Sequence, residues 1–206
     1  MAQILLIDLE QIKQEAEKLE ELFPSLSQEL RLDKAAKNIF NITYPDSVNL
    51  AQEHISRFTI EDSGGSDKCT YCDYLFMSSV ESDRQAHELM HIEYEKVERQ
   101  FGFVPRGGEA REAEKKIAHK EMAITSSHEK QLKGALRLMR VYFERSLELA
   151  ISNGDWSNHP EFEQYIAMLD LYIFPQKAMK AIREKYGKID GGIDTGMTIW
   201  QMSAEH

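Results

Sequence analysis

The sequence predicts a mainly α fold, a helical bundle-like domain. Amphipathic stretches, with apolar residues three and four positions apart, recur along most of the 206 residues. Alternation of apolar and polar residues with a period of two is almost absent, apart from a few residues around the two cysteines. Only five prolines and 11 glycines interrupt the chain, which leaves room for long helices.

The N-terminal half is expected to contain four helices. The first covers residues 7–23 and ends near Pro24, and the second covers residues 25–40. A third helical stretch over residues 47–60 follows a turn, although its β-branched end fits a helix less well. The fourth helix is expected from about residue 79 to residue 101, where a glycine follows.

The C-terminal half is dominated by helical periodicity over residues 109–151. This stretch is either one very long helix or two helices with a break near the sequence "TSSH". Two shorter helices are expected over residues 161–174 and 176–187, separated by a proline. The tail, residues 189–206, is expected to be irregular, with Trp200 as a candidate anchor.

Charge and hydropathy narrow the classes of function. A formal net charge of −10 argues against a surface that binds nucleic acid or anionic lipid as a whole, because like charges repel. No run approaches the roughly 20 apolar residues that span a bilayer, and the apolar run at residues 4–7 is too short for a signal peptide. We therefore expect an intracellular, cytoplasmic protein.

The two cysteines of the chain, Cys69 and Cys72, are separated by two residues, a spacing that lets both thiolates point at one ion. His87 and His91 are four residues apart, so they share one face of a helix. Zinc favours four such ligands in a tetrahedron, and a structural site uses protein groups for all four. We predict that these residues bind zinc and tie the loop at residues 61–68 to the following helix.

Residues 67–92 resemble a two-Cys, two-His zinc finger, and Phe76 stands where that family has its packing aromatic residue. Between the Cys pair and the His pair lie 14 residues, compared with about 12 in the family, and Arg84 replaces the usual leucine. The resemblance implies a small ββα insertion in the helical protein. The expected parts of one compact unit are N-terminal helices (1–60), a zinc-finger-like segment (61–101), a long-helix bundle (109–188) and the tail (189–206).

The expected role of the finger is structural, with a protein partner. Reading DNA requires positive potential on the recognition helix, but acids outnumber bases there: Glu81, Asp83, Glu88, Glu93, Glu95 and Glu98 against Arg84, Lys96 and Arg99. Residues 111–145 carry nine basic and five acidic side chains. This strip is either a solvated face with ion pairs or a docking surface for an acidic partner, including nucleic acid.

The sequence "HELMH" also resembles the His-Glu-x-x-His motif of zinc peptidases. That resemblance implies zinc ligation by His87 and His91, with Glu88 as the general base and Glu112 as the third ligand. It leaves both cysteines without a role, and the polar stretch before His87 is unlike the buried, apolar helix of those enzymes.

A further alternative is a di-metal carboxylate bundle, because Glu88 and His91 also form a Glu-x-x-His pair on a helix. Such proteins use a second copy of the pair on another helix. None is found in the sequence, although Glu53, Glu112 and Glu121 would offer carboxylates.

Overall fold

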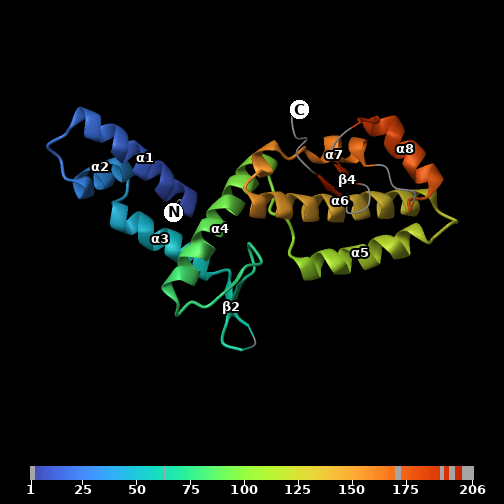
Figure 1. Ribbon diagram of the computed structural model, residues 1–206, viewed down its shortest axis with the longest axis horizontal. Helices are drawn as coiled ribbons and strands as arrows, with labels where there is room; N and C mark the ends of the chain where they lie inside the picture. Colours follow the sequence, from blue (N-terminus) through green and yellow to red (C-terminus); the bar gives the residue numbers. More distant parts are fainter. Residues whose placement is uncertain (1–2, 63, 170–172, 191–192, 195–197, 201–206) are drawn as a thin grey trace. The chain divides into compact units, whose positions relative to one another are not determined.

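The computed structural model describes residues 3–62, 64–169, 173–190, 193–194 and 198–200. Within these residues the protein is mainly α, as predicted, with eight α-helices and two small antiparallel sheets. The chain forms two compact units, residues 1–102 and residues 103–206 (Figure 1). In the part of the chain that is described, no helix has both the length and the apolar character needed to cross a membrane.

The first three helices of unit 1 are α1 (Leu6–Leu22), α2 (Gln28–Phe40) and α3 (Tyr44–Ser56). Side-chain caps start α2 and α3, where the hydroxyls of Ser27 and Thr43 accept hydrogen bonds from backbone amides. The three helices bury one apolar core: Ile4, Leu6, Leu9, Ile12, Ala16, Leu19, Ala35, Ala36, Ala51 and Ile55.

A three-stranded antiparallel sheet follows, formed by β1 (Thr59–Glu61), β2 (Asp67–Cys69) and β3 (Leu75–Phe76). The predicted helical extension to residue 60 is wrong. Thr59 pairs with Cys69 and Ile60 pairs with Lys68, because β-branched residues suit a strand that has a partner to pair with. The predicted pair of strands around the cysteines therefore gains a third strand.

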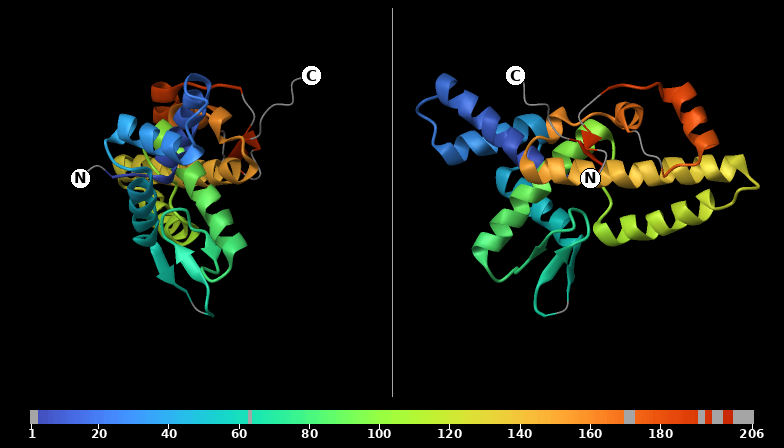
Figure 2. Two further views of the ribbon diagram at one scale, coloured as in Figure 1. Left: turned by 90° about the vertical axis from the view of Figure 1, so that its left-hand side faces the viewer. Right: turned by 45° about the vertical axis from the view of Figure 1, so that its right-hand side comes forward.

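The sheet packs through β3 against α4 (Glu81–Phe101) (Figure 2). The helix begins two residues later than expected, at Glu81, and it ends at Gly102, which has a φ of 75°. Its buried positions are unusual for a helix, because they include two imidazoles and a carboxylate: the five residues are His87, His91, Tyr94, Glu95 and Val97. Burial of such groups is stable only when they find partners.

In unit 2, residues 109–151 form two helices, α5 (Gly108–Met122) and α6 (His128–Asn153). Of the two predicted arrangements, the broken one is correct. The break places the Ser127 hydroxyl where it accepts the amide of Lys130 and caps α6.

The rest of unit 2 packs on α6. It comprises a 3-10 helix (Trp156–Asn158), α7 (Phe162–Met168), α8 (Gln176–Tyr186) and the paired strands β4 (Ile193–Asp194) and β5 (Ile199–Trp200). The tail is thus not wholly irregular, and the backbone amide of Trp200 is anchored on the Ser146 hydroxyl at 2.8 Å.

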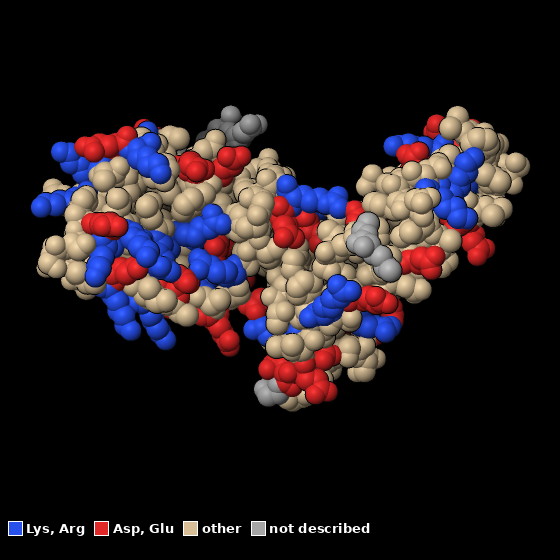
Figure 3. Space-filling view, turned by 180° about the vertical axis from the view of Figure 1, so that it is seen from behind, with Lys and Arg blue, Asp and Glu red and all other residues tan. Residues whose placement is uncertain are grey.

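Five of the nine basic side chains in the strip at residues 111–145 form ion pairs with described residues of unit 2. Arg137 contacts the carboxylates of Glu114 and Glu121, and Arg140 lies 3.0 Å from Glu144. Lysines and arginines on this unit are accordingly interleaved with acidic side chains (Figure 3). These ion pairs lower the positive potential available to a phosphate backbone.

Gly134 allows α5 and α6 to approach closely. A Cβ at this position would lie 2.7 Å from the backbone oxygen of Ala118 and 2.9 Å from Met122 Cγ. We expect Gly134→Ala to destabilise unit 2 by about 1–3 kcal/mol, since overpacking outweighs the gain in helix propensity. Thermal unfolding checks this, with Gly108→Ala as the control, because a Cβ there meets only Arg111 Nη2 at 3.9 Å. Equal melting of both variants and the wild type would contradict the close approach.

His159 is buried in unit 2 with both ring nitrogens hydrogen-bonded. Nδ1 lies 3.0 Å from the Pro160 carbonyl oxygen and Nε2 lies 2.9 Å from the Ser146 hydroxyl. Burial lowers the pKa of His159 from 6.5 to about 4, although the Pro160 carbonyl opposes the shift. The imidazole is therefore neutral in the folded protein at neutral pH.

We predict that unit 2 loses stability as the pH falls from about 6.5 to about 4, because the unfolded chain then binds a proton that the folded chain excludes. The loss attributable to His159 is about 3 kcal/mol. Imidazole NMR titration and thermal unfolding at several pH values check this, and His159→Gln should show a weaker pH dependence. Titration of His159 near pH 6.5 would contradict the prediction.

Candidate metal centre

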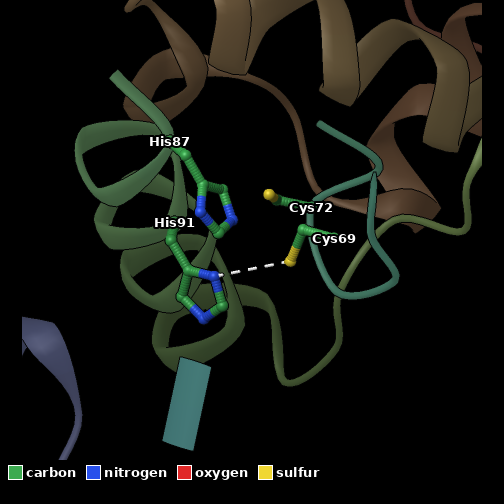
Figure 4. Close-up of side chains that lie close together, drawn as sticks. All are labelled: Cys69, Cys72, His87 and His91. Atoms are coloured by element: carbon green, nitrogen blue, oxygen red, sulfur yellow. Dashed lines mark hydrogen bonds between the residues drawn. The ribbon is translucent and has the colours of Figure 1, made fainter. Parts of the chain in front are cut away.

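The four predicted ligands come together in unit 1. The sulfurs of Cys69 and Cys72 and one ring nitrogen each of His87 and His91 all lie within 4.8 Å of one another. The four residues are at most 4% exposed, and both cysteines are free thiols. The imidazoles extend from α4 toward the two sulfurs (Figure 4).

A tight turn after β2 directs both cysteines to the same side. The backbone amide of Cys69 donates to the carbonyl of Tyr74 at 2.9 Å. Asp73 completes the turn in the left-handed conformation, with a φ of 59°, which aspartate tolerates better than most residues. The Asp73 carboxylate also pairs with Lys68 at 2.7 Å. The spacing of two residues therefore forms the turn that a pair of ligands requires.

Aromatic side chains from the sheet and its turn hold the two imidazoles in place. Phe76, the predicted packing aromatic, stacks on His87 with ring centroids 4.1 Å apart and an interplanar angle of 18°. Tyr71 stacks on His91 at 4.4 Å and also 18°. Each imidazole is thus covered by an aromatic ring from the segment that carries the cysteines, so the sheet and α4 share a small common core.

The surroundings of the sulfurs favour a thiolate at Cys69. The neighbouring Cys72 thiol lowers the pKa of Cys69, with smaller contributions from His87 and His91. The same contact, together with burial, raises the pKa of Cys72. The backbone amides of Cys72 and Tyr74 act in the lowering direction on the pKa values of Cys69 and Cys72 respectively. Cys69 is therefore readily present as a thiolate, whereas Cys72 keeps its proton. A bound cation that replaced this proton would stabilise Cys72 as a second thiolate.

The donor set fits a tetrahedral zinc ion. Zn–S and Zn–N bonds of about 2.3 and 2.0–2.1 Å imply ligand-to-ligand separations of roughly 3.3–3.8 Å in a tetrahedron. Cys69 Sγ lies 3.7 Å from His91 Nδ1. His87 Nε2 is buried and has no hydrogen-bond partner among the described residues, as expected of a nitrogen reserved for a metal.

A second buried group, which the sequence did not reveal, adjoins the first and consists of His54, His91 and Glu95. Glu95 Oε1 lies 3.6 Å from His91 Nε2. Burial raises the pKa of Glu95, and the hydrogen bond from the Ile7 amide is the main effect that opposes this shift. Burial lowers the pKa of His54, because it disfavours the charged imidazole. Glu95, which the sequence places among the acids of α4, is 1% exposed. Its position four residues after His91 was the available signal.

The carboxylates of the alternative sites lie outside these two groups of buried residues. Glu88 accepts a hydrogen bond from Gln52 Nε2 at 3.0 Å. Glu112 belongs to unit 2, where it pairs with Lys115 at 3.3 Å. Glu121 pairs with Arg137 at 3.1 Å, and Glu53 is exposed on α3. Among the described residues, none of the four joins a cluster of metal-ligand type.

No family model, curated protein or solved structure matches this chain. The function is therefore argued from the chemistry of the site itself.

Proposed function

We propose that Cys69, Cys72, His87 and His91 bind one structural zinc ion, and that the protein acts by binding a protein partner. The observation that carries the proposal is the burial of four zinc-type donors whose ligand atoms lie within 4.8 Å of one another, two on α4 and two on the segment opposite. The bound ion stabilises this part of unit 1, as an apolar core does in other small domains. These ligands would hold the three-stranded sheet against α4.

The number of ligands favours a structural role over catalysis. Catalytic zinc sites use three protein ligands and leave a position for water or substrate, whereas four donors converge here. Glu88, the general base of the peptidase alternative, is engaged by Gln52. A closed tetrahedral site has no position at which a bound water would be activated.

The outer face of the sheet supports a protein partner. Ile60 and Leu75 flank Lys68 on neighbouring strands, and they are 50% and 56% exposed. Side chains alternate between the faces of a strand, so these three project from the face opposite Cys69. Exposed apolar side chains beside the Lys68–Asp73 ion pair suit a partner protein that has an exposed apolar patch. The ion pairs within the basic strip make nucleic acid the weaker proposal for a partner.

One observation keeps a hydrolase as a second candidate. A pocket of about 210 Å³ in unit 1 is lined by His87, Glu88 and Arg84, among other residues. Pockets next to a metal ligand are where substrates bind in metalloenzymes. This candidate needs one of the cysteines to leave the metal, which would open a position for water.

Zinc analysis of the purified protein tests the proposal directly. We expect one zinc per chain, and absorption at the zinc edge should show two sulfurs near 2.3 Å and two nitrogens near 2.0–2.1 Å. A shell in which oxygen replaces one or both sulfurs would contradict the structural site and favour the hydrolase.

Cys69→Ser should lower zinc content and the melting temperature of unit 1 together. At free zinc about 100-fold above Kd, binding stabilises a protein by about 2.7 kcal/mol, or roughly 10–20 °C for a unit of this size. The variant should melt where the chelator-treated wild type melts. Thr70→Ser, a change on the exposed turn that retains the hydroxyl, is the matched control. Unchanged zinc content and melting in Cys69→Ser would refute the assignment.

Glu88→Gln separates the two candidate functions. The structural site predicts wild-type zinc content and melting within about 0.5 kcal/mol, since the change is outside the four ligands. A hydrolase would keep its zinc but lose peptidase activity by orders of magnitude. Peptidase activity in the wild type that disappears in Glu88→Gln would establish the second candidate.

A further inference from the structure

The two nitrogens of His91 face different neighbours. Nδ1 lies 3.7 Å from Cys69 Sγ, within the group of metal ligands. Nε2 lies 3.6 Å from Glu95 Oε1, is fully buried and has no hydrogen-bond partner among the described residues. His91 therefore connects the candidate metal centre to the second buried group.

Metal binding through Nδ1 determines what Nε2 must do. A ligating imidazole is neutral, so its one remaining proton lies on Nε2, and that buried N–H requires an acceptor. The nitrogens of nearby His54 lie 3.1 and 3.3 Å from Gln3 Nε2 and face that amide. Glu95 is thus the acceptor for His91. The present separation slightly exceeds the ~3.2 Å limit of N–H···O bonds, and a small side-chain rotation closes it.

Glu95 also binds the start of α1. Its Oε2 accepts the backbone amide of Ile7 at 2.9 Å, and Oε1 lies 3.4 Å from the amide of Leu6. The first amides of a helix have no partner within the helix, and the N-cap residue of α1 is Leu5, which has no side-chain acceptor. The carboxylate therefore supplies from α4 the cap that the sequence of α1 lacks, and it suits the positive end of the helix dipole.

The chain of contacts continues along α4. Arg99, four residues beyond Glu95, pairs with Asp8, whose carboxylate accepts the amide of Leu5 at 2.8 Å. One face of α4 thus presents four side chains at intervals of four residues: His87, His91, Glu95 and Arg99. The first two are candidate metal ligands, and the last two hold the beginning of α1.

We propose that Glu95 is a positioning residue that couples metal binding to the docking of α1. The inference rests on the proposed zinc site, and it assigns to that site an effect on the N-terminal helix. A metal-bound His91 donates its Nε2 proton to Glu95 and orients the carboxylate toward Leu6 and Ile7. Loss of the metal removes this restraint and frees the first turn of α1.

Glu95→Gln tests the coupling, because it keeps the size of the side chain but removes the charge. We expect the variant to bind Zn²⁺ 10–100-fold more weakly in competition with a chromophoric chelator, the usual cost of losing such an outer partner. Asp8→Asn is the matched control, since it weakens the start of α1 without a contact to His91. Asp8→Asn should retain wild-type zinc affinity. If Glu95 acted only by capping α1, the two variants would have the same effect on zinc affinity.

Hydrogen exchange of the wild type provides a test that does not depend on folding of a variant. Chelation of Zn²⁺ should accelerate exchange of the Leu6 and Ile7 amides at least tenfold, whereas these amides in Glu95→Gln should exchange at one rate with and without Zn²⁺. A wild-type protein that binds Zn²⁺ without protecting these amides, or a Glu95→Gln variant with wild-type affinity, would overturn the coupling alone. A wild type that does not bind Zn²⁺ would overturn both the coupling and the zinc site.

Discussion

The buried polar face of α4 is the constraint on which unit 1 depends. An amphipathic helix normally packs through leucine, isoleucine or valine, but α4 places two imidazoles and a carboxylate at its inner positions. Desolvation of these groups costs several kcal/mol unless they are paired. The turn carrying Cys69 and Cys72 lies opposite the imidazoles, and the start of α1 lies opposite Glu95. Both neighbouring elements are thus arranged to satisfy the polar groups of one helix.

Local sequence patterns were sufficient to predict the helical fold and the grouping of the four candidate ligands. Helical periodicity and a proline define α1 closely, and cysteine and histidine spacings depend on a turn and a helix, both of which form locally. The predictions that were wrong or missing depended on partners that lie outside the helical pattern itself. Ile60 is a strand residue because Lys68 pairs with it, and Glu95 is buried because it meets Ile7. The available signals were the β-branched residues near Ile60 and the position of Glu95 four residues after His91, and neither signal identifies the partner.

The departures from finger spacing also acquire a physical explanation. The 14 residues between Cys72 and His87 include β3 and a short turn, and α4 begins six residues before its first histidine. Arg84, where the zinc-finger family has leucine, is exposed. The packing expected of that leucine comes from the aromatic side chains of Phe76 and Tyr71. The small core of the site is therefore aromatic and is shared with the imidazoles.

The positions of these contacts along the chain imply an order of assembly. All four candidate ligands lie within residues 69–91, so the site closes a short segment at a small cost in chain entropy. The bonds from Glu95 to Leu6 and Ile7 instead join residues 89 and 88 positions apart. During synthesis α1 emerges first, yet the cap for its first turn arrives only after α4 has been made. The first turn of nascent α1 therefore stays incompletely capped until α4 has been synthesised.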